Sequence, residues 1–229
     1  MSDAVEKLKH SELFRSLNDD QLQQVANLVK WRDFKKGSEM VHYLGEDDDV
    51  YFLVSGRVTT TIFSFEGKEI SYQELGPGAT FGELSAIDGL PRTANVIALE
   101  NSQVGVMSSA HFWQVVEQYP GVAAAALARL AGMVRFLIDR VYQYGALDVN
   151  SRVRMEVLRL ARQNMSDADS AVIDNFPTHK EIASRVNTHR EAVTRELNEL
   201  TRLNVIEQEK RVLTVLSVSK LEDLLPESV

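Results

Sequence analysis

The spacing of hydrophobic and polar positions changes twice along the chain and divides it into three parts. From residue 31 to residue 108, short runs rich in Val, Ile, Thr, Tyr and Phe are separated by turn signals, of which the clearest are Ser55-Gly56, Glu66-Gly67 and Gly76-Pro77-Gly78. Short strands at such regular spacing indicate a β-barrel or jelly roll. Before them, Asn18 and Gln21 have the spacing of a capping box at the start of a helix.

The second part is one long helix. Residues from Pro120 to Leu147 follow a helical period, and a rod of that length spans about 40 Å. Steps of three and four residues predict a seam close to a heptad repeat, formed by Ala126, Leu130, Met133, Leu137, Arg140 and Tyr144. Such a helix either folds onto its own domain or pairs with its copy. Because it is longer than packing on a small barrel requires, we favour a homodimer.

In the third part, from about residue 150, helical patterns alternate with a short β tail. The segment "SRVRMEVLRLARQ" is amphipathic, and "NMSDADSAVIDNFP" is expected to be a loop or a short turn element. The segment "VIEQEKRVLTVL" is typical of a hairpin with its turn near Gln208-Glu209-Lys210.

Two closely spaced helices lie between that loop and the hairpin. Thr178 with Glu181, and Thr188 with Glu191, both have the spacing of a helix-starting capping box. The first helix is expected to bury Ile182, Ala183 and Val186, and the second Val193, Leu197 and Leu200. Asn187 falls where a tight helix–turn–helix needs a left-handed residue, which asparagine tolerates.

The second helix of the pair predicts DNA binding. A recognition helix contacts base edges with its N-terminal residues, arginine to guanine and glutamate to cytosine, which fits Arg190, Glu191 and Arg195. The alternative is that these residues form surface pairs, such as Arg195 with Glu191 or Glu199. The following hairpin favours a winged DNA-binding domain with Lys210 and Arg211 near phosphate.

The segment "FGELSAIDGLPRTANV", residues 81–96, predicts an anion-binding site. Gly82 allows close approach, the amides of "GELS" can hold an anion, and Arg92 can supply a bidentate charge. Glu83 fits beside an anion if it accepts a hydrogen bond from a hydroxyl or from Arg92. A ligand with a phosphate and a sugar hydroxyl meets both demands; the alternative is a barrel loop with a structural Glu–Arg pair.

Composition limits the chemistry. The 229 residues include no cysteine, which excludes disulfides, thiolate zinc sites and iron–sulfur clusters. The charged N-terminus has no signal peptide and no apolar run approaches the ~18 residues of a membrane span, so we expect a soluble, cytoplasmic protein without a membrane partner. The net charge is −8, and the last 79 residues hold 12 Lys and Arg against 13 Asp and Glu, so DNA binding must depend on local geometry. No nucleophile–base pair or metal cluster suggests an enzyme.

Taken together, the β-roll, residues 81–96, the long helix, the "ALDVNSRV" hinge and "THKEIASRVNTHREAVTRELNEL" resemble the CRP/FNR family of bacterial transcription regulators, nearest its cyclic-AMP receptor branch. The resemblance covers essentially the whole chain. It implies an α+β fold with a cyclic-nucleotide-binding β-roll at residues 1–119, a dimerisation helix and hinge at 120–149, and a winged helix–turn–helix at 150–229.

The resemblance also assigns roles to residues. Gly82 and Glu83, with the amides of Leu84 and Ser85, match the phosphate-binding cassette, in which the glutamate accepts from the ribose. Arg92 matches the arginine that pairs with the cyclic phosphate, and Thr93 the hydroxyl residue beside it. The DNA-contacting residues match readers of a palindrome with TGTGA and TCACA arms; these are Arg190, Glu191 and Arg195. Thr178 and His179 lie at the backbone-contacting end of the pair, where His179 replaces a basic family residue.

The identity of the effector is left open between cAMP and cGMP. Leu137 and Ile138 occupy the positions at which the cyclic-AMP receptor presents two hydroxyl residues to adenine. Thr93 after the arginine favours guanine in other cyclic-nucleotide domains, and Gln73 could bond either base. Iron–sulfur sensing needs cysteines that are absent, and haem sensing has only His42 and His111 as weak candidates.

The sequence leaves three hypotheses for the function of the protein. The preferred one is a homodimeric regulator of double-stranded DNA controlled by cAMP or cGMP, with RNA polymerase expected as a partner by resemblance. The second is a constitutive regulator with a vestigial or differently liganded pocket. The third is a cyclic-nucleotide-binding signalling module that acts on a protein partner. Activator and repressor roles are both open.

Overall fold

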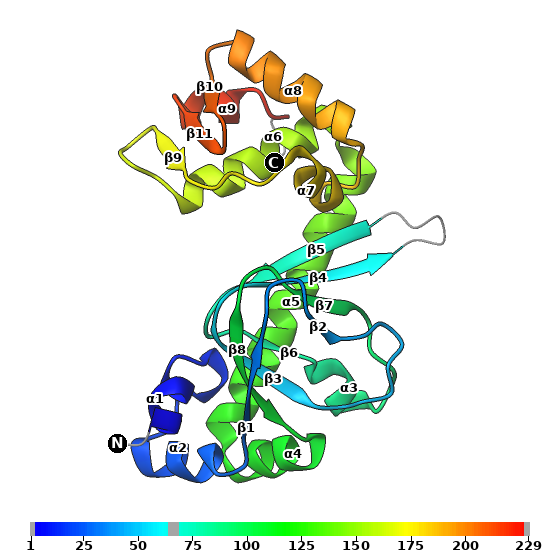
Figure 1. Cartoon of the computed structure of the whole chain (residues 1–229). Helices are drawn as coiled ribbons and strands as arrows, with labels where there is room; N and C mark the ends of the chain where they lie inside the picture. Colours follow the sequence, from blue (N-terminus) through cyan, green and yellow to red (C-terminus); the bar gives the residue numbers. More distant parts are fainter. Residues whose placement is uncertain (1–2, 64–68, 227–229) are drawn as a thin grey trace. The chain divides into compact units, whose positions relative to one another are not determined.

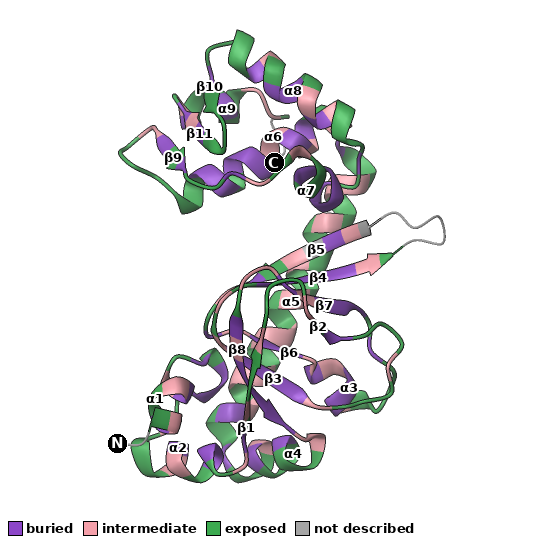
Figure 2. Ribbon diagram, viewed as in Figure 1, coloured by how far each residue is buried: buried purple, intermediate pink, exposed green. Residues whose placement is uncertain are grey.

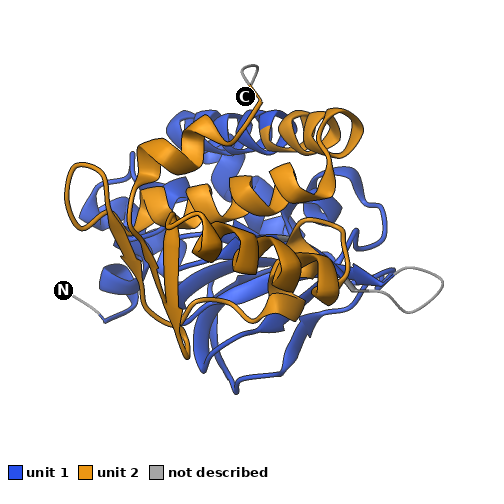
Figure 3. Ribbon diagram, turned by 90° about the horizontal axis from the view of Figure 1, so that it is seen from above, with its two compact units in different colours: residues 1–135 blue, residues 136–229 orange. Residues whose placement is uncertain are grey.

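The computed structural model describes residues 3–63 and 69–226. The turn expected at Glu66-Gly67 lies outside the described residues. The chain forms two compact units, Met1–Arg135 and Phe136–Val229, which divide within the long helix (Figure 3).

The N-terminal unit opens with three short helical elements that cover one end of a β-structure (Figure 1). These are α1 (Asp3–Lys9), the 3-10 helix η1 (Glu12–Phe14) and α2 (Asp19–Ala26). The capping box predicted for α2 is confirmed. The Asn18 side chain accepts from the Gln21 amide and the Gln21 side chain accepts from the Asn18 amide, both at 3.0 Å.

Two antiparallel four-stranded sheets form the predicted β-roll. One has the order β1-β8-β3-β6 and the other the order β2-β7-β4-β5. Strands of both sheets contribute to one apolar core between them, which includes Leu53, Val58 and Val104. Aligned sheets bury their inward side chains in this way because successive residues of a strand point to opposite faces. The strands are β1 (Lys30–Phe34), β2 (Glu39–Val41), β3 (Val50–Ser55), β4 (Val58–Phe63), β5 (Glu69–Leu75), β6 (Thr80–Phe81), β7 (Asn95–Ala98) and β8 (Ser102–Met107).

A short helix, α3 (Glu83–Asp88), interrupts the roll between β6 and β7. It is bounded by two glycines in left-handed conformation, Gly82 with φ +81° and Gly89 with φ +70°. At Gly82 the backbone also approaches its neighbours closely. An added Cβ would lie 2.7 Å from the Asp49 carbonyl oxygen and 2.8 Å from Nη1 of Arg92. Only glycine satisfies both conditions at this position.

Two helices complete the N-terminal unit, α4 (Ser109–Gln118) and α5 (Pro120–Ala146). Their apolar faces and those of the first helices pack on β3 and β8 in a second core, which includes Phe14, Phe52, Phe112 and Val122. Beyond Val122 no residue of α5 is fully buried (Figure 2). By length and composition alone, α5 could cross a membrane, which the sequence analysis did not expect. The same composition suits a helix whose apolar face meets a partner.

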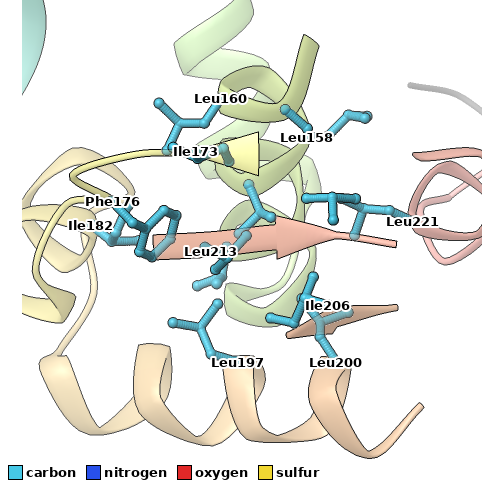
Figure 4. Packing of buried hydrophobic residues seen from close by; sticks show 14 of the residues in the cluster. Leu158, Leu160, Ile173, Phe176, Ile182, Leu197, Leu200, Ile206, Leu213 and Leu221 are labelled. Carbon is cyan, nitrogen blue, oxygen red and sulfur yellow. The ribbon is translucent and has the colours of Figure 1, made fainter. Parts of the chain in front are cut away.

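The C-terminal unit packs helices around a small antiparallel sheet of order β10-β11-β9. Its core joins residues of every helix of the unit after α5 to the sheet, among them Leu158, Phe176, Leu197, Leu213 and Leu221 (Figure 4). The elements are α6 (Val149–Gln163), β9 (Ala171–Ile173), α7 (His179–Arg185), α8 (Arg190–Arg202), β10 (Ile206–Glu209), β11 (Val212–Val215) and α9 (Val218–Asp223).

Strand β9 lies in the segment that was expected to be a loop or a short turn. Ala171 and Ile173 are buried and Val172 is exposed, the alternation of a half-buried strand. Its partner is β11, about forty residues later in the chain, with Ile173 opposite Leu213. The predicted hairpin of β10 and β11 is confirmed, and its turn falls at Lys210 and Arg211, with Lys210 at φ +54°.

Buried ion pairs tie the helices of the C-terminal unit together. Nε of Arg154 on α6 lies 2.6 Å from Glu196 on α8. Glu156 accepts from Arg159 at 2.7 Å and from Arg185 of α7 at 3.1 Å. Burial alone would raise the pKa of Glu156, but the two guanidinium groups hold this pKa below its ordinary value. The carboxylate therefore stays ionised within the core.

Replacing Gly82 with alanine is expected to destabilise the protein more than replacing Gly89 does. Both positions are left-handed, which costs a non-glycine residue about 1–2 kcal/mol. Only at Gly82 would the new methyl also collide with its surroundings, since a Cβ at Gly89 meets nothing within 4 Å. Chemical denaturation of the two variants measures the difference in free energy of unfolding. Equal losses would contradict the close contact at Gly82.

Candidate functional site

A small cavity of about 60 Å³ lies in the β-roll between β4, β5, α3 and the loop before β7. It brings together seven residues predicted from the sequence as ligand-binding: Gln73, Gly82, Glu83, Leu84, Ser85, Arg92 and Thr93. Two residues of α5, Arg129 and Met133, also line it. Ligand cavities are typically about 300–1,000 Å³, so this cavity is smaller than those that usually hold a ligand of nucleotide size.

Arg92 is held at the cavity by several acceptors. Its side chain is 2% exposed. Nε donates to a carboxylate oxygen of Asp47 at 3.0 Å and Nη2 donates to the same oxygen. Nη1 donates to the Gly82 carbonyl and Nη2 to the Asp49 carbonyl, both at 2.8 Å. The ring of Tyr51 lies 5.8 Å from Cζ.

The loop that carries Arg92 is fixed by backbone bonds to the loop that carries Asp47. The Arg92 amide donates to the Gly45 carbonyl at 3.0 Å, and the Leu44 amide donates to the Arg92 carbonyl at 3.0 Å. Burial is the main cause that raises the pKa of Tyr51, and Asp47 adds to it while Arg92 opposes it. The backbone bonds therefore fix the position of the Arg92 guanidinium, and Asp47 neutralises its charge.

Glu83 is also paired. The carboxylate is buried and accepts from Nε of Arg129 at 3.1 Å. Sequence analysis expected Glu83 to accept from a hydroxyl or from Arg92, and it assigned no role to Arg129. A buried carboxylate binds a guanidinium because burying an unpaired charge has a large desolvation penalty. The pair joins the loop of the predicted cassette to helix α5.

Two predicted ligand residues do not line this cavity. Leu137 and Ile138 lie on α5 beyond Met133, within the C-terminal unit, and both side chains are exposed. The α5 residues that do line it, Arg129 and Met133, precede Leu137 by two turns and one turn of helix.

Helix α5 has two opposite faces, and most of the predicted seam residues contact their own chain. Met133 lines the cavity, Ala126 packs on the N-terminal core, and Arg140 donates to Gln143 and to the Arg185 carbonyl at 3.3 and 3.2 Å. Tyr144 also donates to the Arg185 carbonyl, at 3.3 Å, so four of the six predicted seam residues contact their own chain. A period of 3.5 residues cannot by itself distinguish a face that meets the same chain from one that meets a partner.

The exposed face of α5 carries its own heptad pattern. Residues spaced alternately by three and four are all apolar or glycine and all exposed: Ala124, Leu127, Ala131, Val134, Ile138, Val141 and Gly145. We call these seven residues the exposed seam. A stripe of this kind is the sequence and surface pattern of a coiled coil.

In the C-terminal unit, α7 and α8 form the predicted helix–turn–helix. The capping box of Thr178 and Glu181 is confirmed, and Asn187 has the expected left-handed φ of +51°. The second predicted box is wrong. Helix α8 begins after His189 with no side-chain cap, because Thr188 is buried and its amide donates to the Ala183 carbonyl at 2.9 Å.

The three predicted base-contacting residues are exposed on α8. The apolar face of the helix is buried as expected, with Val193, Leu197 and Leu200 in the core. Glu199 pairs with Arg202 at 2.7 Å and not with Arg195. Among residues 3–63 and 69–226, no ion pair holds Arg190, Glu191 or Arg195, which disfavours the alternative of surface pairs.

A hollow of about 500 Å³ lies between the start of α7, the start of α8 and the wing. It brings together five of the residues predicted to contact DNA: Thr178, His179, Arg190, Lys210 and Arg211. Two further polar residues line it that the sequence analysis did not predict to contact DNA, Lys180 and Gln208. Cations from three separate elements thus line one concave surface, which suits a phosphate backbone.

His179 has a structural partner within this surface. Its Nδ1 lies 2.7 Å from the hydroxyl of Thr194, and that hydroxyl donates to the Arg190 carbonyl at 3.0 Å. This contact joins His179 of α7 to Thr194 of α8.

Comparison with known proteins gives matches to both units. The cyclic nucleotide-binding domain model matches residues 31–119, and the Crp-like helix-turn-helix domain model matches residues 151–224. The cyclic AMP receptor protein of Thermus thermophilus is 24% identical over 95% of this chain and 98% of its own length. The cAMP-activated global transcriptional regulator CRP of Escherichia coli is 29% identical over 78% of this chain and 85% of its own length.

Solved structures share the fold. A CooA variant of Carboxydothermus hydrogenoformans has a TM-score of 0.78 at 18% identity and covers 93% of each chain. The c-di-GMP responsive regulator CLP of Xanthomonas campestris has a TM-score of 0.76 at 16% identity, covering 86% of this chain and 99% of its own. With the β-roll, the long helix and the winged helix–turn–helix in the same order, the chain belongs to the CRP/FNR family of transcription regulators, whose members are not enzymes.

Proposed function

We propose that the protein is a cytoplasmic, homodimeric transcription regulator that binds double-stranded DNA under the control of a cyclic nucleotide, cAMP or cGMP. One observation carries the proposal: a buried guanidinium, a left-handed glycine and a buried carboxylate lie around one cavity, with helix α5 supplying an arginine to the carboxylate. Relatives named as cyclic-AMP receptors support this class of effector. RNA polymerase is proposed as a further partner, by resemblance to the family.

In this proposal the ligand exchanges two contacts within the cavity. The cyclic phosphate takes the Nε and Nη2 edge of Arg92, with the amides of Leu84 and Ser85 beside it. The ribose hydroxyl donates to Glu83 and so competes with Arg129 for the carboxylate. Because Arg129 belongs to α5, the exchange changes the contacts of that helix. A ligand shifts the protein only through different affinity for its two states, and this pair is a candidate for that difference.

The base has no polar pair on α5 near the cavity. Gln73, Thr93 and Thr60 are polar lining residues that remain for it, since Met133 is apolar. An amide side chain can donate and accept, so it can bond adenine or guanine. Both cAMP and cGMP are therefore retained as effectors.

Replacing Arg92 with glutamine is expected to weaken binding of the preferred cyclic nucleotide at least thirtyfold. A bidentate charged contact contributes about 2–4 kcal/mol. Isothermal titration of cAMP and cGMP into both proteins measures the change. Arg57→Gln is the matched control, because Arg57 lies exposed in the β3–β4 turn, where it pairs with Glu100. The proposal is contradicted if Arg92→Gln binds like the natural protein.

The DNA surface is proposed to face a palindrome with TGTGA and TCACA arms. Arg190 and Arg195 suit guanine and Glu191 suits cytosine, and the hollow beside them suits the backbone. In a dimer the two recognition helices would contact half-sites about 34 Å apart. Because the protein has a net charge of −8, its affinity for DNA must come from these local contacts.

Arg190→Ala is expected to lower affinity for this palindrome by about 1–3 kcal/mol and to relax the preference for the matching base pair. Fluorescence anisotropy with a palindromic and a scrambled duplex measures both effects. Arg202→Ala is the control, because Arg202 lies at the other end of α8 and pairs with Glu199. Unchanged discrimination in the Arg190 variant would argue for a module that does not bind DNA through this helix.

The exposed seam is proposed as the dimer contact. Ile138→Asp would place two like charges in the interface and is expected to yield monomers in analytical ultracentrifugation. Gly132→Asp is the control: it lies on the flank of α5, and a Cβ there meets nothing within 4 Å. A dimer that persists in the Ile138 variant, or dissociates equally in both, would exclude this face.

One observation favours a second candidate, a constitutive regulator with a vestigial or differently liganded pocket. The cavity is only about 60 Å³, and both of its key charges already have partners within the chain. Titration of the natural protein separates the two candidates, because a vestigial pocket binds neither cAMP nor cGMP.

A further inference from the structure

We propose that Asp47 is a displaceable internal counter-ion, which occupies the anion-binding edge of Arg92 and sets the ligand concentration needed to fill the site. The inference rests on the proposed function, since it assumes that this edge binds an anionic effector. It concerns a residue that neither the sequence motif nor the family comparison assigns.

The contacts divide the guanidinium into two functional edges. The Gly82 and Asp49 carbonyls, which accept from Nη1 and Nη2, belong to the backbone and remain in place. The remaining edge, Nε with Nη2, donates to one carboxylate oxygen of Asp47. Nε and Nη2 form the edge of a guanidinium that can bind a carboxylate or a phosphate bidentately. An incoming phosphate must therefore displace Asp47 in order to bind there.

The difference in exposure of the two side chains means that Asp47, and not Arg92, can leave the pair. Arg92 is 2% exposed, whereas the Asp47 side chain is 49% exposed. A buried cation without a counter-ion is strongly unfavourable, but a carboxylate that already contacts water can leave for solvent. Asp47 thus satisfies Arg92 when the cavity is empty, and the cyclic phosphate, a monoanion, replaces it charge for charge.

Neighbouring contacts let the side chain of Asp47 move alone. The two loops stay joined by the backbone bonds of Arg92 with Gly45 and Leu44. Asp48 is tied separately, since it accepts from the Ser109 hydroxyl of α4. The loop therefore has fixed points on both sides of Asp47, and only a side-chain rotation is needed for the exchange.

Two consequences follow for Asp47→Asn, which keeps the shape and removes the charge. Ligand affinity is expected to rise by about tenfold or more, because the competitor for Arg92 is weakened. The unliganded protein is expected to unfold several degrees lower, because Arg92 loses its counter-ion. Opposite effects on binding and on stability distinguish an internal competitor from a residue that merely supports the loop.

The test is titration of cAMP and cGMP into the full-length natural protein, Asp47→Asn and Glu46→Gln, with thermal unfolding of each in chloride and in sulfate. Glu46 is the adjacent exposed acid, so Glu46→Gln controls for the local field. The expected result is tighter nucleotide binding by Asp47→Asn alone, and larger stabilisation of that variant by sulfate, which refills the edge of Arg92.

Equal nucleotide affinities in the natural protein and Asp47→Asn would overturn the proposal, as would a matching gain in Glu46→Gln. If neither nucleotide binds any of the proteins, the sulfate arm decides. Selective rescue of Asp47→Asn by sulfate then supports the counter-ion role while cyclic-nucleotide control fails. Equal sulfate effects overturn the counter-ion role as well.

Discussion

The N-terminal unit depends on a buried guanidinium that must always be neutralised. Arg92 is almost fully buried, and its guanidinium donates to the Asp47 carboxylate and to the Gly82 and Asp49 carbonyls. A left-handed glycine brings the Gly82 carbonyl within reach, and the neighbouring acidic loop supplies Asp47. Since a lone buried cation is unfavourable, the site is stable only with an anion in it. An internal carboxylate and an external phosphate are alternative solutions of the same electrostatic problem.

Helix α5 is the element through which this site could affect the rest of the molecule. Its inner face supplies Arg129 to Glu83, and its opposite face carries the exposed seam. Further along, Arg140 and Tyr144 both donate to the Arg185 carbonyl at the end of α7, at 3.2 and 3.3 Å. One helix thus contributes to the effector cavity, the proposed dimer contact and the support of the helix–turn–helix. Contacts of one helix with several sites are a physical basis for coupling between those sites.

Sequence alone predicted what depends on local rules and missed what depends on distant partners. The capping box at Thr178, the left-handed Asn187 and the buried faces of α7 and α8 follow from nearby residues, and all agree with the structure. Thr188 did not cap α8, because it is buried and its amide bonds Ala183. Strand β9 was missed because its partner β11 lies far along the chain. Asp47 and Arg129 were missed for the same reason, being 45 and 46 residues from Arg92 and Glu83.

The most direct test of ligand-controlled DNA binding is the affinity of the full-length dimer for the TGTGA palindrome, measured by fluorescence anisotropy at fixed salt with and without saturating cAMP or cGMP. Coupling between two sites usually changes affinity by about 5- to 150-fold. The account predicts tighter binding within that range for at least one nucleotide, with no comparable gain on a scrambled duplex. Equal affinity in the presence and absence of both nucleotides would contradict it.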